Sequence, residues 1–226
     1  TCAGEFIDKL CDDNGPKVQY IPVKGRKALT MDEDGKVSWN KLIAVTRHPP
    51  GPMLKVTTQS GRTMTCTVSK SFLTLKKNKW VPTSGKELKV GMKVPLISNV
   101  PDIHKRDHHC GKMIANFMAC GSVSETGLVL KKKYYASGNK YKFIVHGEDV
   151  VVLNRKLILA FMHFREIPVF LIGCSTKVAQ DFTNTYIAMK GVQKKYQGDT
   201  VWEVKCKKTH RDILGLLLGK VGTHSI

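Results

Sequence analysis

The densest cluster of side chains able to bind an anion is KKKYY, where Lys131, Lys132 and Lys133 precede Tyr134 and Tyr135. The whole chain holds 37 basic and 18 acidic residues, which gives a formal charge of +19. Ammonium groups attract phosphate oxygens, so this charge favours a polyanionic partner, most often nucleic acid. A basic protein without a dedicated partner is the alternative, because charge informs about partners and not about fold.

Side chains that bind metals gather in the segment DIHKRDHHC, which contains His104, His108, His109 and Cys110. A structural zinc site needs a second ligand pair at finger spacing, which the segment lacks, so we interpret it as a solvated polar loop. Seven cysteines without a C-x-x-C pair argue against a disulfide framework and indicate a reducing compartment. We therefore expect no cofactor, and an intracellular protein of the cytoplasm or nucleus.

The length of 226 residues allows one large domain or two small ones, each with a hydrophobic core. No apolar run approaches the ~20 residues of a membrane-spanning helix. No signal peptide precedes the first expected strand. We therefore expect no membrane partner.

Residues 1–98 are predicted to form a compact all-β module, because turn signals recur at regular intervals. A short helical turn is expected at Glu5–Leu10, and Asp32–Gly35 is a D-G hairpin turn. The proline-rich segment His48–Pro52 interrupts the strands. Strands are expected at 18–23, 28–31 and 37–47, in a run beginning at Leu54 and over 63–75, before a tryptophan turn at Trp80.

Residues 99–226 show an α+β pattern that repeats imperfectly, over about 106–165 and 166–226. The caps expected for its helices are Asn154 and Ser175 at two N-termini, and Gly121 and Gly191 as C-caps. The expected helices are 112–120, 154–164, 176–189 and 209–220, and the expected strands are 128–135, 141–146, 150–153 and 200–206.

The segment from Leu54 to Leu96 resembles the self-splicing Hint module of inteins. The shared features are a strand, an SGR turn, T-x-x-x-S-F-L beginning at Thr67, and L-x-V-G-x-x-V-P beginning at Leu88. The resemblance implies protein splicing, with a histidine polarising the scissile amide and Thr67 in the same motif. Lys70 replaces that histidine, and a protonated lysine cannot accept a proton as imidazole does.

The second part resembles the LAGLIDADG, or dodecapeptide, homing endonucleases that lie inside inteins. The family's paired helices and the phrases around them match in both halves and in the closing helix. The matching residues are Gly111, Ala115, Ala119, Gly121, Ser122 and Val123, then Arg165, Ile167, Pro168, Phe170, Phe182, Tyr186 and Gly191, and finally Asp212, Leu216, Leu217 and Gly222.

This second resemblance implies a monomeric pseudo-dimer in which two helices cross closely and flanking sheets contact double-stranded DNA. Ala115 and Ala119 would lie on the contact face of one helix, and Thr185 and Met189 on that of the other. The structural alternatives are ordinary packed helices and a solvated, charged edge strand. The expected DNA contacts are Lys131, Lys132, Lys133, Tyr135, Lys140, Lys142, Lys205, Lys207 and Lys208.

The catalytic residues that the two families need are replaced. The endonucleases place a carboxylate at the C-terminal end of each paired helix to hold Mg²⁺, and these positions map to Cys120 and Lys190. A thiol is a poor Mg²⁺ ligand and an ammonium repels the ion. The first splicing block, with its nucleophile, is not found after Cys2, and His224 is not followed by the cyclising asparagine.

The sequence therefore predicts an α+β protein in which an all-β Hint-like module (1–98) precedes a two-repeat LAGLIDADG-like region (99–226). The expected function is that of an intein-derived DNA-binding protein, degenerate in splicing and in cleavage. One alternative is an active endonuclease in which unconventional acids such as Glu125 or Asp181 hold Mg²⁺. The other is a structural insert within a polymerase-type host protein, with flanking extein segments as partners.

Overall fold

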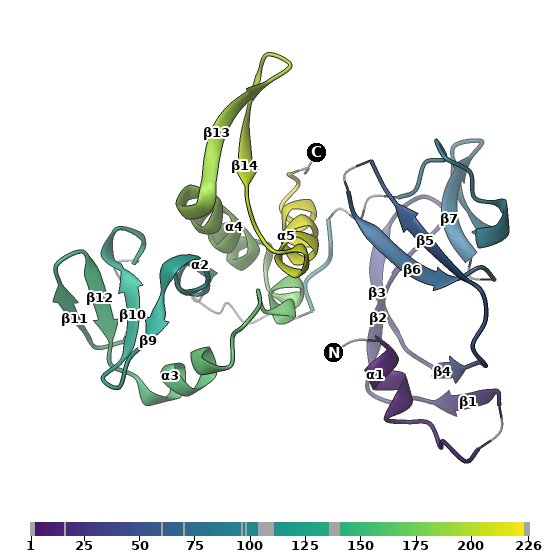
Figure 1. The fold of residues 1–226 in the computed structure, drawn as a ribbon, viewed down its shortest axis with the longest axis horizontal. Helices are drawn as coiled ribbons and strands as arrows, with labels where there is room; N and C mark the ends of the chain where they lie inside the picture. Colours follow the sequence, from purple (N-terminus) through teal and green to yellow (C-terminus); the bar gives the residue numbers. More distant parts are fainter. Residues whose placement is uncertain are drawn as a thin grey trace. The chain divides into compact units, whose positions relative to one another are not determined.

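A computed structural model describes residues 3–15, 17–59, 61–69, 71–95, 97, 99–103, 111–135 and 141–223. The fold is mixed α+β with small antiparallel sheets, and the chain divides into two compact units, Thr1–Leu96 and Ile97–Ile226 (Figure 1). The boundary expected from the sequence lies two residues further on, between 98 and 99. None of the helices among the described residues is long and apolar enough to cross a membrane.

The first unit consists of a short helix and antiparallel strand pairs. Helix α1 (Ala3–Asp8) precedes all the strands, and a 3₁₀ turn, η1 (Gly85–Glu87), follows the last one. The four pairs are β1 (Gln19–Pro22) with β4 (Ala44–Arg47), β2 (Lys27–Met31) with β3 (Val37–Lys41), β5 (Met53–Thr57) with β6 (Thr63–Thr67), and β7 (Ser71–Lys76) with β8 (Lys79–Ser84).

Two expected strands and one expected turn of this unit are corrected by the pairing. The strand expected at 37–47 is two strands, because the chain changes partner from β2 to β1 at Leu42 and Ile43. The run 63–75 is likewise divided, since β6 pairs with β5 and β7 with β8. Trp80 lies inside β8, and the turn is at Lys77 and Asn78, whose φ angles of 48° and 62° suit a two-residue hairpin.

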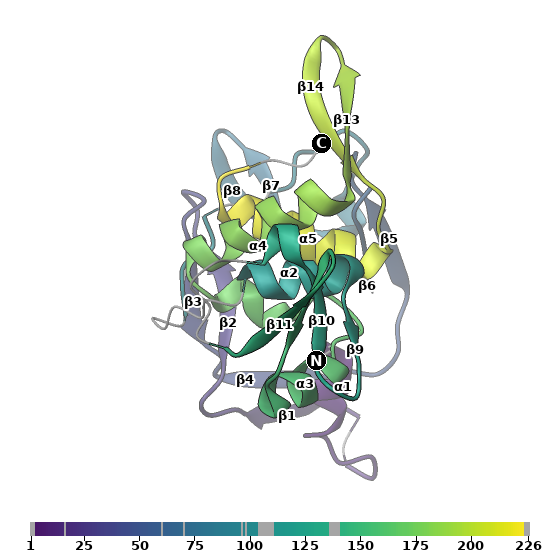
Figure 2. The same cartoon turned by 90° about the vertical axis from the view of Figure 1, so that its left-hand side faces the viewer.

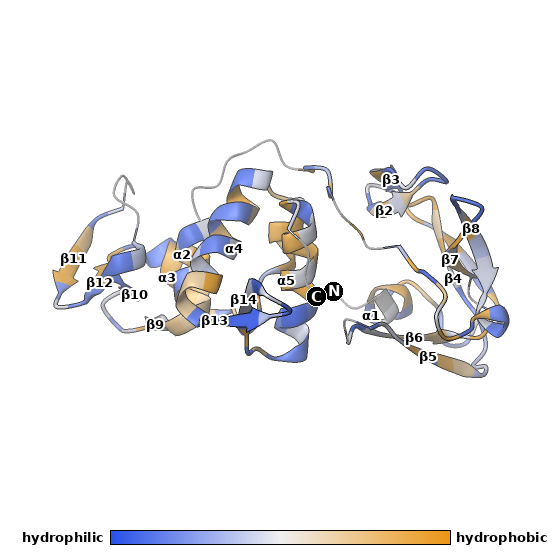
Figure 3. Cartoon of the chain, turned by 90° about the horizontal axis from the view of Figure 1, so that it is seen from above, coloured by the Kyte–Doolittle hydropathy of each residue, from blue (hydrophilic) through white to orange (hydrophobic). Residues whose placement is uncertain are grey.

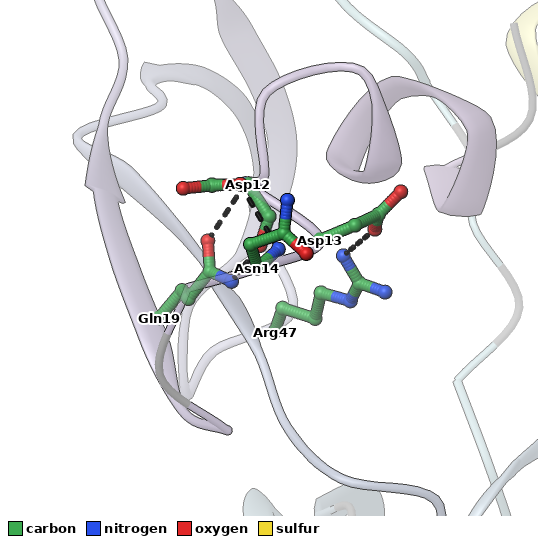
Figure 4. Close-up of polar contacts among 5 residues, drawn as sticks. All are labelled: Asp12, Asp13, Asn14, Gln19 and Arg47. Carbon is green, nitrogen blue, oxygen red and sulfur yellow. Dashed lines mark hydrogen bonds and ion pairs between the residues drawn. The ribbon is translucent and has the colours of Figure 1, made fainter.

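Polar contacts fasten the loop after α1 to the pair β1–β4 (Figure 4). The Gln19 side chain accepts a hydrogen bond from the Asp12 main-chain N–H at 3.0 Å and donates one to its carbonyl at 2.5 Å. The Arg47 guanidinium forms an ion pair with Asp13 at 2.8 Å. The buried hydroxyls of Thr74 and Thr83, 2.6 Å apart, add a polar contact between β7 and β8. Among the described residues of this unit the buried apolar side chains are Val45 and Phe72.

The second unit contains two helix–strand–helix halves of unequal size. In the first half, the strands form one sheet in the order β11-β12-β10-β9, whereas the second half has a single two-stranded ribbon. The elements are α2 (Gly111–Cys120), β9 (Ser122–Val123), β10 (Leu128–Lys131), η2 (Lys132–Tyr134), β11 (Phe143–His146), β12 (Asp149–Val152), α3 (Arg155–Met162), η3 (Val169–Gly173), α4 (Thr176–Lys190), β13 (Gly191–Tyr196), β14 (Asp199–Val204) and α5 (Lys208–Lys220).

The helix caps expected for this unit are confirmed at both N-termini. The Asn154 side chain accepts a hydrogen bond from the N–H of Leu157, and the Ser175 hydroxyl accepts one from Val178. Strand β13 was not expected from the sequence, and its presence makes the second half helix, two strands, helix. Buried apolar residues from both halves form the core: Ile114, Leu128, Leu130, Phe182 and Leu217.

Glycines at the two helix-to-strand junctions allow close approach and do not supply a left-handed cap. Gly191 has φ −82°, and Gly121 is not among the glycines with positive φ. A Cβ on Gly121 would lie 2.6 Å from the Cα of Phe117, and one on Gly191 2.6 Å from the carbonyl oxygen of Ile187. Both glycines take the expected C-cap positions, because the N–H of Gly121 donates to the carbonyl of Phe117 and that of Gly191 to the carbonyl of Ile187. The chain then leaves each helix directly in an extended conformation.

Candidate nucleic-acid interface at the paired helix ends

Helices α2 and α4 form the central contact of the second unit and run in the same direction. They contact each other more extensively than any other two elements among the described residues and lie side by side in Figures 1 and 2. Near their beginnings, a Cβ on Gly111 would meet the carbonyl oxygen of Val178 at 2.4 Å. Near their ends, Lys190 is close enough to Cys120 to influence its ionisation. Ala115 and Ala119 are buried, as expected for a helix contact face.

The side chains at these paired C-terminal ends are a thiol and an ammonium group, both exposed. Partial burial raises the pKa of the Cys120 thiol. The positive charges of Lys131 and Lys190 lower this pKa, and the negative charge of Asp149 raises it. The thiol therefore remains protonated at neutral pH. Among the residues that the structure describes, no group of three His, Cys, Asp or Glu side chains could hold a metal.

The last residue of β10, Lys131, is held near these helix ends by the buried amide side chain of Asn116. The side chain of Asn116, in α2, donates to the carbonyl oxygen of Lys131 and accepts from its N–H, each at 2.9 Å. The Lys131 ammonium group forms an ion pair with Asp149 on the neighbouring strand at 2.8 Å. Sequence reasoning missed Asn116 and Asp149, because neither belongs to a local motif and both approach only through the packing of α2 on the sheet.

Replacing Asn116 by leucine is expected to lower the free energy of unfolding by about 2–4 kcal/mol, because the main-chain donor and acceptor of Lys131 lose their partners in a buried place. Urea denaturation followed by circular dichroism measures the change. The matched control is Cys120→Ala on the same helix, which removes only a weak thiol contact to the Asn116 carbonyl. Equal stability of the two variants would contradict the role given to the amide.

The cluster KKKYY does not form the expected strand beyond Lys131. Lys132–Tyr134 form the 3₁₀ turn η2, because pairing with β12 ends at Lys131 and Asp149. The Tyr134 hydroxyl donates to the carbonyl oxygen of Ala188 in α4 at 3.4 Å, and the Lys133 ammonium lies 5.5 Å from the Tyr134 ring centroid. An open pocket of about 610 Å³ results, lined by Lys131, Lys132, Lys133, Tyr134, Gly147 and Glu148.

A second basic surface is the ribbon β13–β14, which extends away from the helices (Figure 1). Its turn is Gln197 and Gly198, both with positive φ. Lys194 forms an ion pair with Glu203 and lowers the pKa of that carboxyl, while the Lys195 ammonium donates to the Thr200 hydroxyl at 2.9 Å. Tyr196 and Trp202 are about half exposed. In Figure 3, β13 is mostly hydrophilic, whereas the outer strand β11 of the sheet is hydrophobic.

The remaining residues expected to contact DNA are spread over several elements. Tyr135 follows η2 and its ring meets that of Phe143 edge-on at 5.2 Å, and Lys142 precedes β11. Lys205 lies just after β14 and not inside a strand, Lys207 is the N-cap residue of α5, and Lys208 is its first residue. The structure thus places Lys131, Lys132 and Lys133 around one pocket, with Lys131 and Lys190 both close to Cys120, whereas Lys205, Lys207 and Lys208 lie between β14 and the start of α5.

The residues expected to take part in splicing are only partly described. Thr67 is the last residue of β6, and its hydroxyl accepts a hydrogen bond from Ser69 at 3.3 Å. Lys70, Cys2 and His224 lie outside the described residues, as do Lys140 and the segment His104–Cys110. The replacement of the splicing histidine by Lys70 therefore stays a prediction from the sequence.

Comparison with known proteins gives partial matches to three of them, and no family model matches the chain. The chain is 41% identical over 105 residues to the DNA-directed RNA polymerase subunit Rpo1C of Methanocaldococcus jannaschii, covering 43% of this chain and 12% of that protein. It is 26% identical over 149 residues to transcription initiation factor IIB of the same organism, covering 62% and 22%. It is 31% identical over 121 residues to the replication factor C small subunit of Pyrococcus furiosus, covering 52% and 14%.

The chain thus spans less than a quarter of each of these curated relatives. Their names denote an RNA polymerase subunit, a transcription initiation factor and a replication factor subunit, so parts of this chain are similar to parts of proteins named for different tasks. The similarity therefore concerns a segment of each relative and not the whole protein.

Proposed function

We propose that this chain is an intein-derived insertion whose second unit binds double-stranded DNA without cutting it. A segment that moves between genes would produce similarity confined to a small part of otherwise different proteins. The matches to at most 22% of each of three differently named proteins support this origin.

The observation that carries the proposal is the parallel pair α2 and α4, each followed directly by an antiparallel strand pair. This is the arrangement that the resemblance to the LAGLIDADG endonucleases implies. Gly111 and Ala115 on α2 let the helix backbones approach, which places the strands on either side of the helix ends. The two halves are unequal among the described residues, since the second has only the ribbon β13–β14.

DNA binding is supported by where the basic side chains lie. A two-stranded antiparallel ribbon fits the major groove of DNA, and β13–β14 offers Gln193 and Lys195 together with an exposed Trp202. Lysines near the helix ends are placed to contact phosphates, which give affinity and position but do not read the sequence. The ribbon would therefore supply base contacts, and Lys131, Lys132 and Lys133 would supply backbone contacts.

The absence of cleavage follows from Cys120 and Lys190 at the helix ends. Mg²⁺ prefers hard oxygen ligands, and a protonated thiol next to ammonium groups gives it none. The Asp149 carboxylate is engaged with Lys131, Glu125 lies in the turn between β9 and β10, and Asp181 is in the first half of α4, away from the helix ends. The alternative of an endonuclease using unconventional acids is therefore the weaker one.

We expect the chain to bind duplex DNA with an affinity that falls by at least about a thousandfold between ~50 and ~200 mM salt, as for a protein with six or more phosphate contacts. Fluorescence anisotropy with a labelled duplex measures this dependence. Incubation with a library of duplexes and Mg²⁺ should yield no specific cuts. A specific double-strand break would contradict the proposed loss of cleavage, and absence of binding at low salt would remove the DNA-binding function.

A second candidate is a structural insert within a polymerase-type host, with no nucleic acid bound. The observation in its favour is the 41% identity to part of the RNA polymerase subunit Rpo1C. In this case the basic surface would serve only solubility, and the same anisotropy titration would show no binding at any salt concentration. The titration thus separates the two candidates.

A further inference from the structure

We propose that the C-terminal ends of α2 and α4 form a phosphate-binding site that works without a divalent cation, in which Lys190 and the lysines of the η2 pocket hold the DNA backbone directly. The inference rests on the proposed DNA binding and names how this surface holds its ligand. The η2 pocket is the one lined by Lys131, Lys132, Lys133, Tyr134, Gly147 and Glu148.

The η2 pocket adjoins the C-terminal ends of α2 and α4. Tyr134 lines the pocket and its hydroxyl is bonded to Ala188, two residues before Lys190. Lys131 lines the pocket. Both Lys131 and Lys190 lie near Cys120. Hydrogen bonds to Asn116 fix the main chain of Lys131 on α2. The main chain at Lys131 and the side chain of Tyr134 are therefore anchored to α2 and α4.

Half of the positive charge at this place is not balanced by a neighbouring carboxylate. Of its four lysines, Lys131 is paired with Asp149, while Lys132, Lys133 and Lys190 have no carboxylate within 4.0 Å among the described residues. Glu148 is the other acid at the pocket. Four ammonium groups against the carboxylates of Glu148 and Asp149 leave a net charge of +2 where a dianionic or monoanionic phosphate group can sit.

The helix ends by themselves would repel such an anion. Each helix C-terminus carries about half a negative charge, and two parallel helices present two such ends together. The net charge of +2 left by the lysines at this place, after Glu148 and Asp149 are counted, reverses that field. The same reversal excludes a divalent cation, because Mg²⁺ would meet ammonium groups and a protonated thiol where it needs oxygen ligands. The same positive charge thus favours contact with phosphate and excludes a metal ion.

The size of the pocket suits a phosphodiester group with its neighbouring sugars, since about 610 Å³ is open to solvent between η2 and the β11–β12 turn. The Lys133 ammonium lies 5.5 Å from the centroid of the Tyr134 ring, and both residues line the pocket. A DNA strand passing the helix ends would therefore meet the lysines of η2 first and Lys190 next.

The test measures the affinity of the full chain for a labelled duplex of random sequence, with EDTA and then with Mg²⁺ or Ca²⁺. Wild-type affinity is expected to be equal in EDTA and in the cations, to within about twofold. Lys190→Gln should weaken binding about fivefold to tenfold at ~0.1 M salt and reduce the salt slope by about 0.9, the loss of one phosphate contact. Lys190→Glu should weaken it further, and a divalent cation should restore part of the affinity.

The matched controls are Lys156→Gln and Lys156→Glu, which make the same charge changes on α3, a helix packed against β9 and β10. They should change affinity by less than about twofold and show no rescue by cations. A requirement of wild-type binding for Mg²⁺ or Ca²⁺, or equal effects at positions 190 and 156, would overturn the inference while leaving DNA binding in place. No wild-type binding at low salt would instead overturn the proposed function itself.

Discussion

Replacing Gly111 by valine is expected to lower the free energy of unfolding of the second unit by about 3 kcal/mol, within the range of severe overpacking. A Cβ at this position would lie 2.4 Å from the carbonyl oxygen of Val178 and 3.2 Å from the main-chain nitrogen of Phe182. These are backbone atoms of the facing helix, so they cannot swing aside as the end of a side chain can. Helix α4 would have to move away from α2 and loosen the central contact.

Urea denaturation followed by tryptophan fluorescence suits this variant, because Trp202 belongs to the ribbon that follows α4. The matched control is Lys112→Ala on the next residue of α2, which is exposed and should change stability little. A Gly111→Val variant as stable as this control would show that the two helices are not in the close contact described. Such a result would also remove the main support for the proposed relationship.

The second large effect is expected at the buried lysine of α5, where Asp102→Ala should cost about 3 kcal/mol, at the lower end for a broken buried ion pair. The Lys220 side chain has no exposed surface, and its ammonium group donates to Asp102 at 2.6 Å and to the carbonyl oxygen of Val100 at 2.7 Å. Without Asp102 a full charge would stay buried with one carbonyl partner. Asp102 itself is 42% exposed, which limits the cost.

The reverse replacement, Lys220→Met, should be milder, at about 1–2 kcal/mol. It removes the buried charge and leaves Asp102 free to hydrate, so the remaining cost is mainly the unpaired carbonyl of Val100. The double variant should be more stable than the sum of the single effects predicts, because the two groups contact each other. Thermal unfolding of the four proteins checks this order, and an Asp102 variant more stable than Lys220→Met would refute it.

The contact between Lys220 and Asp102 also helps to hold residues 99–103, near the start of the second unit, in place. The N–H of Asn99 donates to the carbonyl of Gly219, and the N–H of Ile103 donates to that of Gly173, each at 3.0 Å. Lys220 lies between these two points and binds the carbonyl of Val100. Residues 99–103 are thus tied to α5 and η3, and loss of Asp102 removes the carboxylate that pairs with Lys220 in that set of contacts.

Local signals in the sequence located most helices of the second unit. Asn154 and Ser175 make the predicted capping bonds, and α4 ends at Lys190, one residue after its expected end. Such caps depend on a few neighbouring residues, so they are visible without knowledge of the fold. The general class, mixed α+β with small antiparallel sheets, was also accessible from the order of these elements.

Strands whose residues form a strand only because another segment pairs with them could not be predicted from the sequence. Strand β13 contains Gln193, Lys194 and Lys195, which have low strand preference, and it forms because β14 pairs with it. The opposite error occurred at Lys132–Tyr134, where strand-like residues form a turn because pairing with β12 ends at Lys131 and Asp149. In each case contacts with another element decide the conformation, and a local pattern does not record them.

The candidate site was only partly accessible for the same reason. Cys120 and Lys190 could be assigned to the helix ends by resemblance, and the structure places these two residues near each other. Asn116 and Asp149, which position Lys131, carry no motif and become visible only when α2 lies on the sheet. The roles of the lysines near residues 205–208 stay predictions.

The placement of Gly121 and Gly191 has a consequence for the history of this protein. These glycines are enclosed by backbone and cannot change without moving a helix, whereas Cys120 and Lys190, one position earlier, project into solvent. Substitutions at these two exposed positions therefore have little effect on folding and act mainly on the chemistry of the site. The residue types at these two positions can therefore change during evolution without passing through an unfolded ancestor.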